Sequence, residues 1–146
     1  MHKTVKFSVK RQDAPGANPY VDEFEVPYEE GMNVTTLLMA TRQFPTTCEG
    51  KETTPVSFES ACLEEVCGSC TMIVNGKVRQ ACTALVDQLE QPIKLEPMTK
   101  FPVRRDLVVD RSQMFNALKK VKAWIEIDGV YDLGEGPKVY PHEQER

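Results

Sequence analysis

The sequence contains the stretch Cys62-Leu-Glu-Glu-Val-Cys67-Gly-Ser-Cys70, followed after eleven intervening residues by Cys82. Thiols at this spacing cannot share one face of a regular helix or strand, so the stretch is predicted to be a loop wrapped around a binding point. Gly68 lacks a side chain where the backbone of such a loop comes close to what it binds. Backbone N–H groups of the loop would point at sulfur atoms there.

The four cysteines form a ligand set that suits either zinc or an iron–sulfur cluster. Structural zinc sites usually combine two separated pairs of closely spaced cysteines, and here only Cys67 and Cys70 form such a pair. The pattern C-x4-C-x2-C with a distant fourth cysteine is instead the plant-type [2Fe–2S] signature. We predict that Cys62, Cys67, Cys70 and Cys82 bind one [2Fe–2S] cluster, with a zinc-stapled interaction domain without redox activity as the alternative.

The fourth cysteine is predicted to reach the site through a β-hairpin. Asn75-Gly76 supplies the two positive φ values of a type I′ turn, and strand-like residues flank it on both sides. Pairing outward from this turn places Cys70 opposite Ala81, so Cys82 would lie beside the end of the loop. Strand register would then deliver the fourth ligand.

Other patterns predict a small mixed sheet with one packed helix. Alternating apolar residues favour strands over residues 3–10, around 23–26 and around 93–95. Asn33 is a suitable N-cap for a short helix, and residues 45–61, which contain two prolines, are predicted to be a loop. The expected buried stripe of the helix comprises Val34, Leu37, Leu38 and Thr41.

A second helix is predicted from Asp110 to about residue 125, with Gln113 completing a capping box. Its expected buried stripe comprises Met114, Phe115, Leu118, Val121 and Ile125, and Trp124 is also expected in the core. The tail from residue 126 is rich in Gly, Pro and charge, which is typical of a linker or a frayed terminus.

Composition places the chain among ordinary globular proteins and excludes several classes. Its 146 residues are 40% hydrophobic and 27% charged, with a net charge of −4 and a pI near 5.3, whereas nucleic-acid-binding domains are basic. No apolar stretch is long enough to span a bilayer, and the first charged residues lack the apolar segment of a secretory signal. We therefore expect a cytoplasmic protein without direct membrane insertion, whose cysteines serve metal or redox roles.

The remaining cysteine and the histidines have simple explanations. Cys48 has no partner at metal-ligand spacing and is expected to be a free, partly buried thiol. His2 and His142 are terminal and have no cysteine or carboxylate at ligand spacing. The sequence contains no nucleophile–base set, Gly-rich phosphate loop or flavin motif, so substrate chemistry is expected to belong to another chain.

Charged residues near the cysteines leave two interpretations open. Glu64 and Glu65 would either lower the potential of a cluster or remain solvated with little effect. Residues 100–122 carry seven cations and two carboxylates. This segment fits either a docking surface for an acidic partner or a solvated helix face.

These features together resemble the iron–sulfur subunit of succinate dehydrogenase and fumarate reductase. Short segments carry the resemblance, at residues 11–12, 62–70, 75–76, 81–85, 96–98 and 101–110. The match runs from about residue 3 to residue 132. The eleven-residue gap before Cys82 separates this family from photosynthetic-type ferredoxins, whose fourth cysteine lies much further away.

The resemblance implies an α+β fold, with a β-grasp, plant-type [2Fe–2S] ferredoxin-like domain over residues 1–105 and the four cysteines at its ligand positions. It implies an electron-transfer subunit of succinate:quinone oxidoreductase or fumarate reductase, which accepts single electrons from the FAD of a flavoprotein subunit for relay to quinone. The implied partners are that flavoprotein and a membrane-anchor cytochrome b-type subunit, which would hold the chain peripherally at the cytoplasmic face of the inner membrane. A free-standing [2Fe–2S] ferredoxin-like carrier is the alternative.

The chain departs from the family pattern after Cys82. Family members continue into a helical domain whose further cysteines hold [4Fe–4S] and [3Fe–4S] clusters, and no cysteine follows Cys82 in this sequence. Residues 106–146 would be the helix and linker that begin this domain. We therefore expect the sequence to be a fragment of a longer subunit, with those two clusters only in the full-length form.

Overall fold

The computed structural model describes residues 3–124, 131–132 and 136–137. The chain divides into two compact units, Met1–Arg111 and Ser112–Arg146, and each is described by itself. Within the described stretches, no helix has both the length and the apolar character needed to cross a bilayer.

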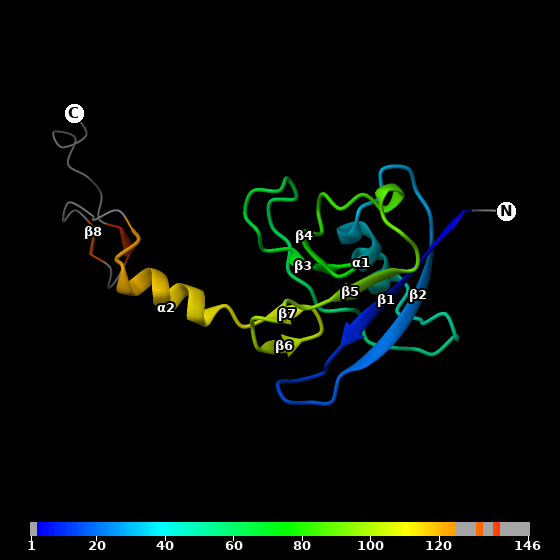
Figure 1. Ribbon diagram of the computed structural model, residues 1–146, viewed down its shortest axis with the longest axis horizontal. Coiled ribbons are helices and arrows are strands. Elements are labelled where there is room, and N and C mark those ends of the chain that lie inside the picture. The colour runs from blue at the N-terminus through cyan, green and yellow to red at the C-terminus, as the bar shows by residue number, and fades with distance from the viewer. Residues whose placement is uncertain (1–2, 125–130, 133–135, 138–146) are drawn as a thin grey trace. The chain divides into compact units, whose positions relative to one another are not determined.

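The first unit is built around a five-stranded mixed sheet with the strand order β2-β1-β5-β3-β4 (Figure 1). Its strands are β1 (Thr4–Arg11), β2 (Tyr20–Pro27), β3 (Thr71–Val74), β4 (Lys77–Gln80) and β5 (Ile93–Glu96). β1 pairs antiparallel with β2 and parallel with β5, while β3 pairs antiparallel with both β4 and β5. The central strand β5 thus joins the N-terminal hairpin to the hairpin that carries the predicted Asn-Gly turn.

Helix α1 (Val34–Gln43) begins at the predicted cap. The Asn33 side chain accepts a hydrogen bond from Thr36 N at 3.0 Å, and Thr36 Oγ1 accepts one from Asn33 N at 2.9 Å. This reciprocal pair satisfies two backbone donors that the helix itself leaves without partners. The stripe predicted to be buried is buried in the structure: Val34, Leu37, Leu38 and Thr41.

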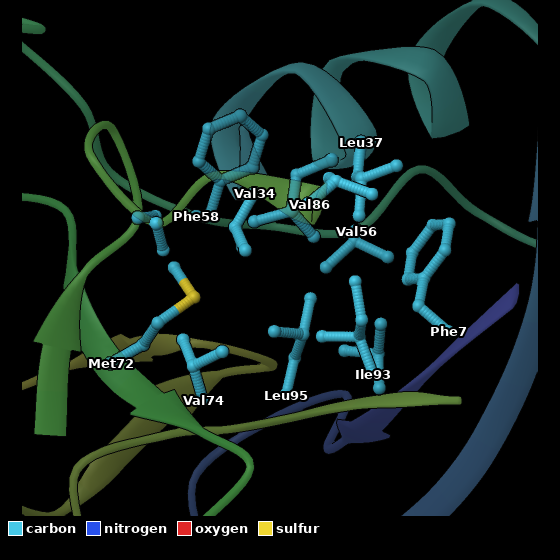
Figure 2. Close-up of a cluster of buried hydrophobic side chains, with 14 of the residues drawn as sticks. Phe7, Val34, Leu37, Val56, Phe58, Met72, Val74, Val86, Ile93 and Leu95 are labelled. Carbon is cyan, nitrogen blue, oxygen red and sulfur yellow. The ribbon is translucent and has the colours of Figure 1, made fainter. Parts of the chain in front are cut away.

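The core of the first unit lies between α1 and one face of the sheet. β1 alternates between buried and more exposed residues, so one of its faces points into this core. Figure 2 shows Val34 on the helix side of the cluster, with Val74 and Leu95 on the strand side. Val56 and Phe58, from the segment predicted to be a loop, pack into the same cluster. Each such aliphatic side chain contributes about 1.5–3 kcal/mol when fully buried.

A second, two-stranded sheet, β6 (Val103–Arg105) and β7 (Val108–Val109), closes the first unit. Asp106 and Leu107, in the turn between these strands, are only 0% and 5% exposed. This turn belongs to the compact unit Met1–Arg111, and a domain boundary after residue 105 stays a prediction.

The first unit has the β-grasp ferredoxin-like architecture that the resemblance implied. Its mixed sheet packs on a single long helix, and the N-terminal hairpin is joined in parallel to a later strand. Among the described residues of this unit, only the short 3₁₀ helix η1 (Val86–Gln88) adds a further helical turn. The predicted α+β fold is therefore confirmed, and the cysteine stretch lies between α1 and β3.

A polar cluster is buried at the end of β1, where Arg11 occupies a core-facing position. Its guanidinium, 0% exposed, donates to the two carboxylate oxygens of Asp106 at 3.0 and 3.1 Å and to Asp22 Oδ2 at 3.0 Å. It also donates to Thr53 Oγ1 and to two oxygens of Thr54. We call Arg11, Asp22, Thr53, Thr54 and Asp106 the Arg11 cluster. Burial acts to lower the pKa of Arg11, but the hydrogen bonds and charge of Asp106 outweigh it, so the pKa is raised.

The second unit contains helix α2 (Ser112–Lys120) and a pairing of β8 (Tyr131–Asp132) with β9 (Gly136–Pro137). The predicted buried stripe of this helix was wrong, because no residue of α2 is buried. The exposed fractions lie between 47% and 73% for Met114, Phe115, Leu118, Val121 and Trp124. Ile125 lies outside the described residues, as does most of the predicted tail. Periodicity identifies an amphipathic helix, but it does not specify a surface that covers its apolar face.

Candidate metal centre

The β3–β4 hairpin brings Cys82 to the cysteine stretch with the predicted register. The two strands pair along their whole length around a turn in which Asn75 and Gly76 have φ values of 48° and 76°. Ala81 N donates to Cys70 O at 3.2 Å, which continues the pairing by one further step. Cys70 and Cys82 are buried, with 3% and 5% exposure. The predicted register, which places Cys70 opposite Ala81 and Cys82 beside the end of the loop, is confirmed.

Residues 62–70, here called the cysteine loop, surround the first thiol with backbone donors. Val66 N and Cys67 N donate to Cys62 Sγ at 3.4 and 3.3 Å. Hydrogen bonds to sulfur are one of the means by which a protein adjusts the potential of an iron–sulfur cluster. The loop therefore presents Cys62 Sγ with two backbone donors in place.

Left-handed backbone conformations allow the cysteine loop to curl this tightly. Leu63, Glu65 and Gly68 have φ values of 61°, 62° and 70°. This conformation costs a non-glycine residue about 1–3 kcal/mol, so the surrounding structure has to hold the loop. A Cβ atom on Gly68 would meet Thr71 Oγ1 at 3.7 Å, an ordinary contact. Gly68 is therefore required for its φ, and the close approach of its backbone to a bound group stays a prediction.

Ser69 controls the ionisation of Cys67. The Ser69 hydroxyl lies 3.1 Å from Cys67 Sγ, and Ser69 N donates to the same sulfur at 3.5 Å. The hydroxyl makes the largest contribution, and with further donors from Cys62 and from the Ser69 backbone it lowers the pKa of Cys67 to about 6. The exposed Cys67 is therefore mainly thiolate at neutral pH, and thiolate is the form that binds metal.

Cys82 shows the opposite shift and connects the remaining thiols. Burial raises the pKa of Cys82, and the neighbouring Cys70 and Cys62 raise it further. The hydrogen bond with Cys70 favours the neutral thiol, and the negative charges of Cys70 and Cys62 disfavour a further one nearby. The backbone N–H of Glu65 acts in the opposite direction. Because Cys62 also acts on Cys67, the four thiols influence one another as one group.

The chemistry of the four side chains bears on which group they could hold. Each is a cysteine, and thiolates are ligands of both zinc and iron–sulfur clusters. A [2Fe–2S] cluster takes four cysteine thiolates, and the structure supplies three on the cysteine loop and a fourth just beyond β4. The residues present therefore fit a [2Fe–2S] cluster.

An arginine that the sequence analysis did not assign to the site contacts the cysteine loop. Arg111 Nη2 donates to Ser69 O at 2.7 Å and lies 3.5 Å from Glu59 Oε2. In the sequence, Arg111 stands out only as part of the basic segment 100–122, which fits a solvated face or a docking surface. Glu64 and Glu65, in contrast, are exposed.

The fifth cysteine is not part of the group. Cys48 is exposed, where a partly buried thiol was predicted. Its backbone N donates to Glu23 O of β2 at 2.8 Å. His2 and His142 lie outside the described residues.

Comparison with known proteins identifies relatives of this architecture. A family model described as a 2Fe-2S iron-sulfur cluster binding domain matches residues 6–116. The chain is 59% identical over 137 residues to the succinate dehydrogenase iron-sulfur subunit of Bacillus subtilis, which covers 94% of this chain and 54% of that protein. It is 34% identical over 107 residues to the fumarate reductase iron-sulfur subunit of Haemophilus influenzae, covering 73% of this chain and 39% of the relative. A solved chain from the Mycobacterium smegmatis Sdh1 complex in the apo form aligns with a TM-score of 0.64 and 25% identity, over 98% of this chain and 56% of that one.

The chain spans about half the length, or less, of these curated relatives. The region matched by the family model includes all four cysteines of the candidate site. The β-grasp architecture and the arrangement of the thiols agree with that match. The chain therefore belongs to the 2Fe-2S iron-sulfur cluster binding domain family and is a relative of the iron–sulfur subunits of succinate dehydrogenase and fumarate reductase.

Proposed function

We propose that Cys62, Cys67, Cys70 and Cys82 hold one [2Fe–2S] cluster, through which the chain passes single electrons in a succinate dehydrogenase or fumarate reductase complex. The observation that carries this proposal is the hairpin register that brings Cys82 to the cysteine loop, together with the mutual influence of the four thiols. The names of the relatives support the choice of complex.

The residues of this chain have distinct tasks at such a site. The cluster, when bound, accepts and releases one electron at a time. Cys67 offers a thiolate at neutral pH because its pKa is lowered to about 6. Cys70 and Cys82 lie in the core and keep water from that side of the site. The N–H groups of Val66 and Cys67 donate hydrogen bonds to Cys62 Sγ and orient it.

The proposal extends to the partners that the resemblance implies. Electrons would arrive from the FAD of a flavoprotein subunit and leave towards a membrane-anchor cytochrome b-type subunit and quinone. The [4Fe–4S] and [3Fe–4S] clusters of the onward relay would belong to the part of the subunit that this chain does not span. The complex would place the chain at the cytoplasmic face of the inner membrane. Its relation to a chain of the Sdh1 complex supports this assembly.

The first test is an EPR spectrum of the anaerobically purified, dithionite-reduced chain, with iron and acid-labile sulfide assayed on the same sample. We expect a rhombic signal from one unpaired electron and about two iron and two sulfide per chain. Zinc in place of iron, with no labile sulfide after reconstitution, would overturn the electron-transfer function and leave a structural metal domain.

The second test separates a complex subunit from a free-standing ferredoxin-like carrier. The tagged chain is expressed together with the flavoprotein subunit of the same complex, and the purified material is assayed for FAD. We expect flavin to copurify with the chain. A loaded chain that never retains the flavoprotein would favour the free-standing carrier.

A further inference from the structure

Arg111 is a cation that the tertiary structure brings to the cysteine loop. The sequence has no lysine or arginine between residues 52 and 76, whereas Glu59, Glu64 and Glu65 all lie in that interval. The segment that holds three of the four thiols therefore carries only negative side chains of its own. Arg111 reaches it from a position 42 residues beyond Ser69 in the sequence.

The contact between Arg111 and the loop is short and specific. Nη2 donates to the carbonyl oxygen of Ser69 at 2.7 Å, and the side chain is 22% exposed. That carbonyl belongs to the peptide group that joins Ser69 to Cys70. A cation hydrogen-bonded to one end of a peptide group polarises it, so the effect reaches the N–H of Cys70 as well. The guanidinium thus acts on the backbone between the second and third cysteines.

The positive charge of Arg111 is only partly balanced by the protein. Its ion pair with Glu59 is 3.5 Å long, and the Glu59 side chain is 47% exposed, so water screens that carboxylate. Arg111 Nε is buried and has no hydrogen-bond partner among the described residues. A half-buried cation with an exposed counter-ion retains a net field in the low-dielectric region beside the thiols.

We propose that Arg111 is a positioning residue that holds the Cys67–Cys70 turn and raises the reduction potential of the cluster, while Glu59 moderates its effect. This inference rests on the proposed function. When the cluster accepts an electron, its negative charge increases by one, and a nearby cation stabilises this reduced form more than the oxidised form. Local charge and hydrogen bonding are the means by which a protein sets such a potential.

The test is an EPR-monitored redox titration of the loaded chain in its wild-type form and in four variants. Arg111→Gln removes the cation, Arg111→Lys keeps a charge without the planar donors, and Glu59→Gln removes the counter-ion. Arg104→Gln is the matched control, because Arg104 also lies in the basic segment but its side chain is 61% exposed and pairs with Asp110 at 3.2 Å. Iron and sulfide are assayed for every sample, and the potential is taken from the loaded fraction.

We expect the midpoint potential to fall in Arg111→Gln, to stay nearer to wild type in Arg111→Lys, and to rise in Glu59→Gln. The control should match wild type. Equal shifts in Arg111→Gln and Arg104→Gln, or an unchanged potential with reduced cluster content, would overturn the electrostatic role. If Arg111→Gln holds no cluster, an unchanged potential in Glu59→Gln would overturn it. A wild-type chain without iron and labile sulfide would instead overturn the proposed function itself.

Discussion

The Arg11 cluster and the cysteine loop are two polar regions of the first unit, and they satisfy their charges in different ways. In the Arg11 cluster, the buried guanidinium meets two carboxylates and two threonines, and Asp106 also accepts from Gln12 N and Ser57 N. At the cysteine loop, the pKa of Cys67 is lowered and that of the neighbouring Cys82 is raised, and the loop has no cation of its own. Protein groups satisfy the charges and hydrogen bonds of the Arg11 cluster, whereas the thiols at the cysteine loop need a bound ligand.

The Arg11 cluster helps to fix the backbone that leads into the cysteine loop. The Arg11 cluster ties down the backbone at Thr54, and Asp106 ties down Ser57. Val56 and Phe58 are buried in the core just before the cysteine loop begins. The strand register of the hairpin fixes the chain where the loop ends. A loop with strained left-handed residues is thus held at both of its ends before any cluster binds, which reduces the ordering cost of binding.

The largest effect is expected at the four cysteines, which need a bound ligand. Cys82→Ser replaces a soft thiolate with a hydroxyl that is a poor iron ligand at neutral pH, so we expect loss of the cluster, measured as iron and labile sulfide per chain. The cluster-free fold should survive, because the hairpin pairing does not depend on the thiol. Cys48→Ser is the matched control and should retain full iron content. A Cys82→Ser chain with two irons would exclude this residue as a ligand.

The second prediction concerns the Arg11 cluster, whose charges are balanced by protein groups. Asp106→Asn keeps the shape of the side chain and tolerates the φ of 47° at this position, but it removes the main countercharge of Arg11. Breaking a buried pair in this way costs about 3–5 kcal/mol, measured as the unfolding free energy in urea. The exposed pair Lys10–Glu96, at 3.9 Å, is the control, and Lys10→Ala should cost no more than about 1 kcal/mol. Equal losses in the two variants would contradict the contrast between buried and exposed pairs.

The smallest effect is expected for the pKa of Cys67 in the cysteine loop. Because the Ser69 hydroxyl is the largest cause of the low pKa of Cys67, Ser69→Ala should raise that pKa from about 6 and leave less thiolate at neutral pH. We expect alkylation of Cys67 in the cluster-free chain to slow by roughly two- to tenfold at pH 7, measured by peptide mass spectrometry across a pH series. The midpoint of the rate profile should move to higher pH. Ser60→Ala, two residues before the cysteine loop, should leave the profile unchanged.

Several features of the fold could be predicted because they depend on neighbours in the sequence. Asn75-Gly76 determines the turn through the positive φ values that both residues tolerate, and the hairpin register follows from the turn. Asn33 marks the start of α1 because its side chain bonds to a backbone donor three residues later. The cysteine spacing identified the thiols that meet, since a loop and one hairpin connect them.

Other features could not be predicted because they depend on groups far apart in the sequence. The salt bridge between Arg11 and Asp106 joins residues separated by 95 positions, and no local pattern distinguishes these two from solvated charges. The contact of Arg111 with Ser69 is of the same kind. The sequence pattern also predicted burial for Met114 and Trp124, which are exposed. An amphipathic stripe indicates an apolar helix face but does not show whether another element covers it.

The ligand types, their spacing, the turn that returns the chain to them and the family resemblance can all be read from the sequence. These depend on backbone sterics and side-chain chemistry, which act over a few residues. The tertiary structure was needed to learn which charges are buried together, which cysteines are buried and which arginine lies against the cysteine loop. Those outcomes depend on burial and on distances between separate segments, because desolvation and Coulomb interactions act through space and not along the chain.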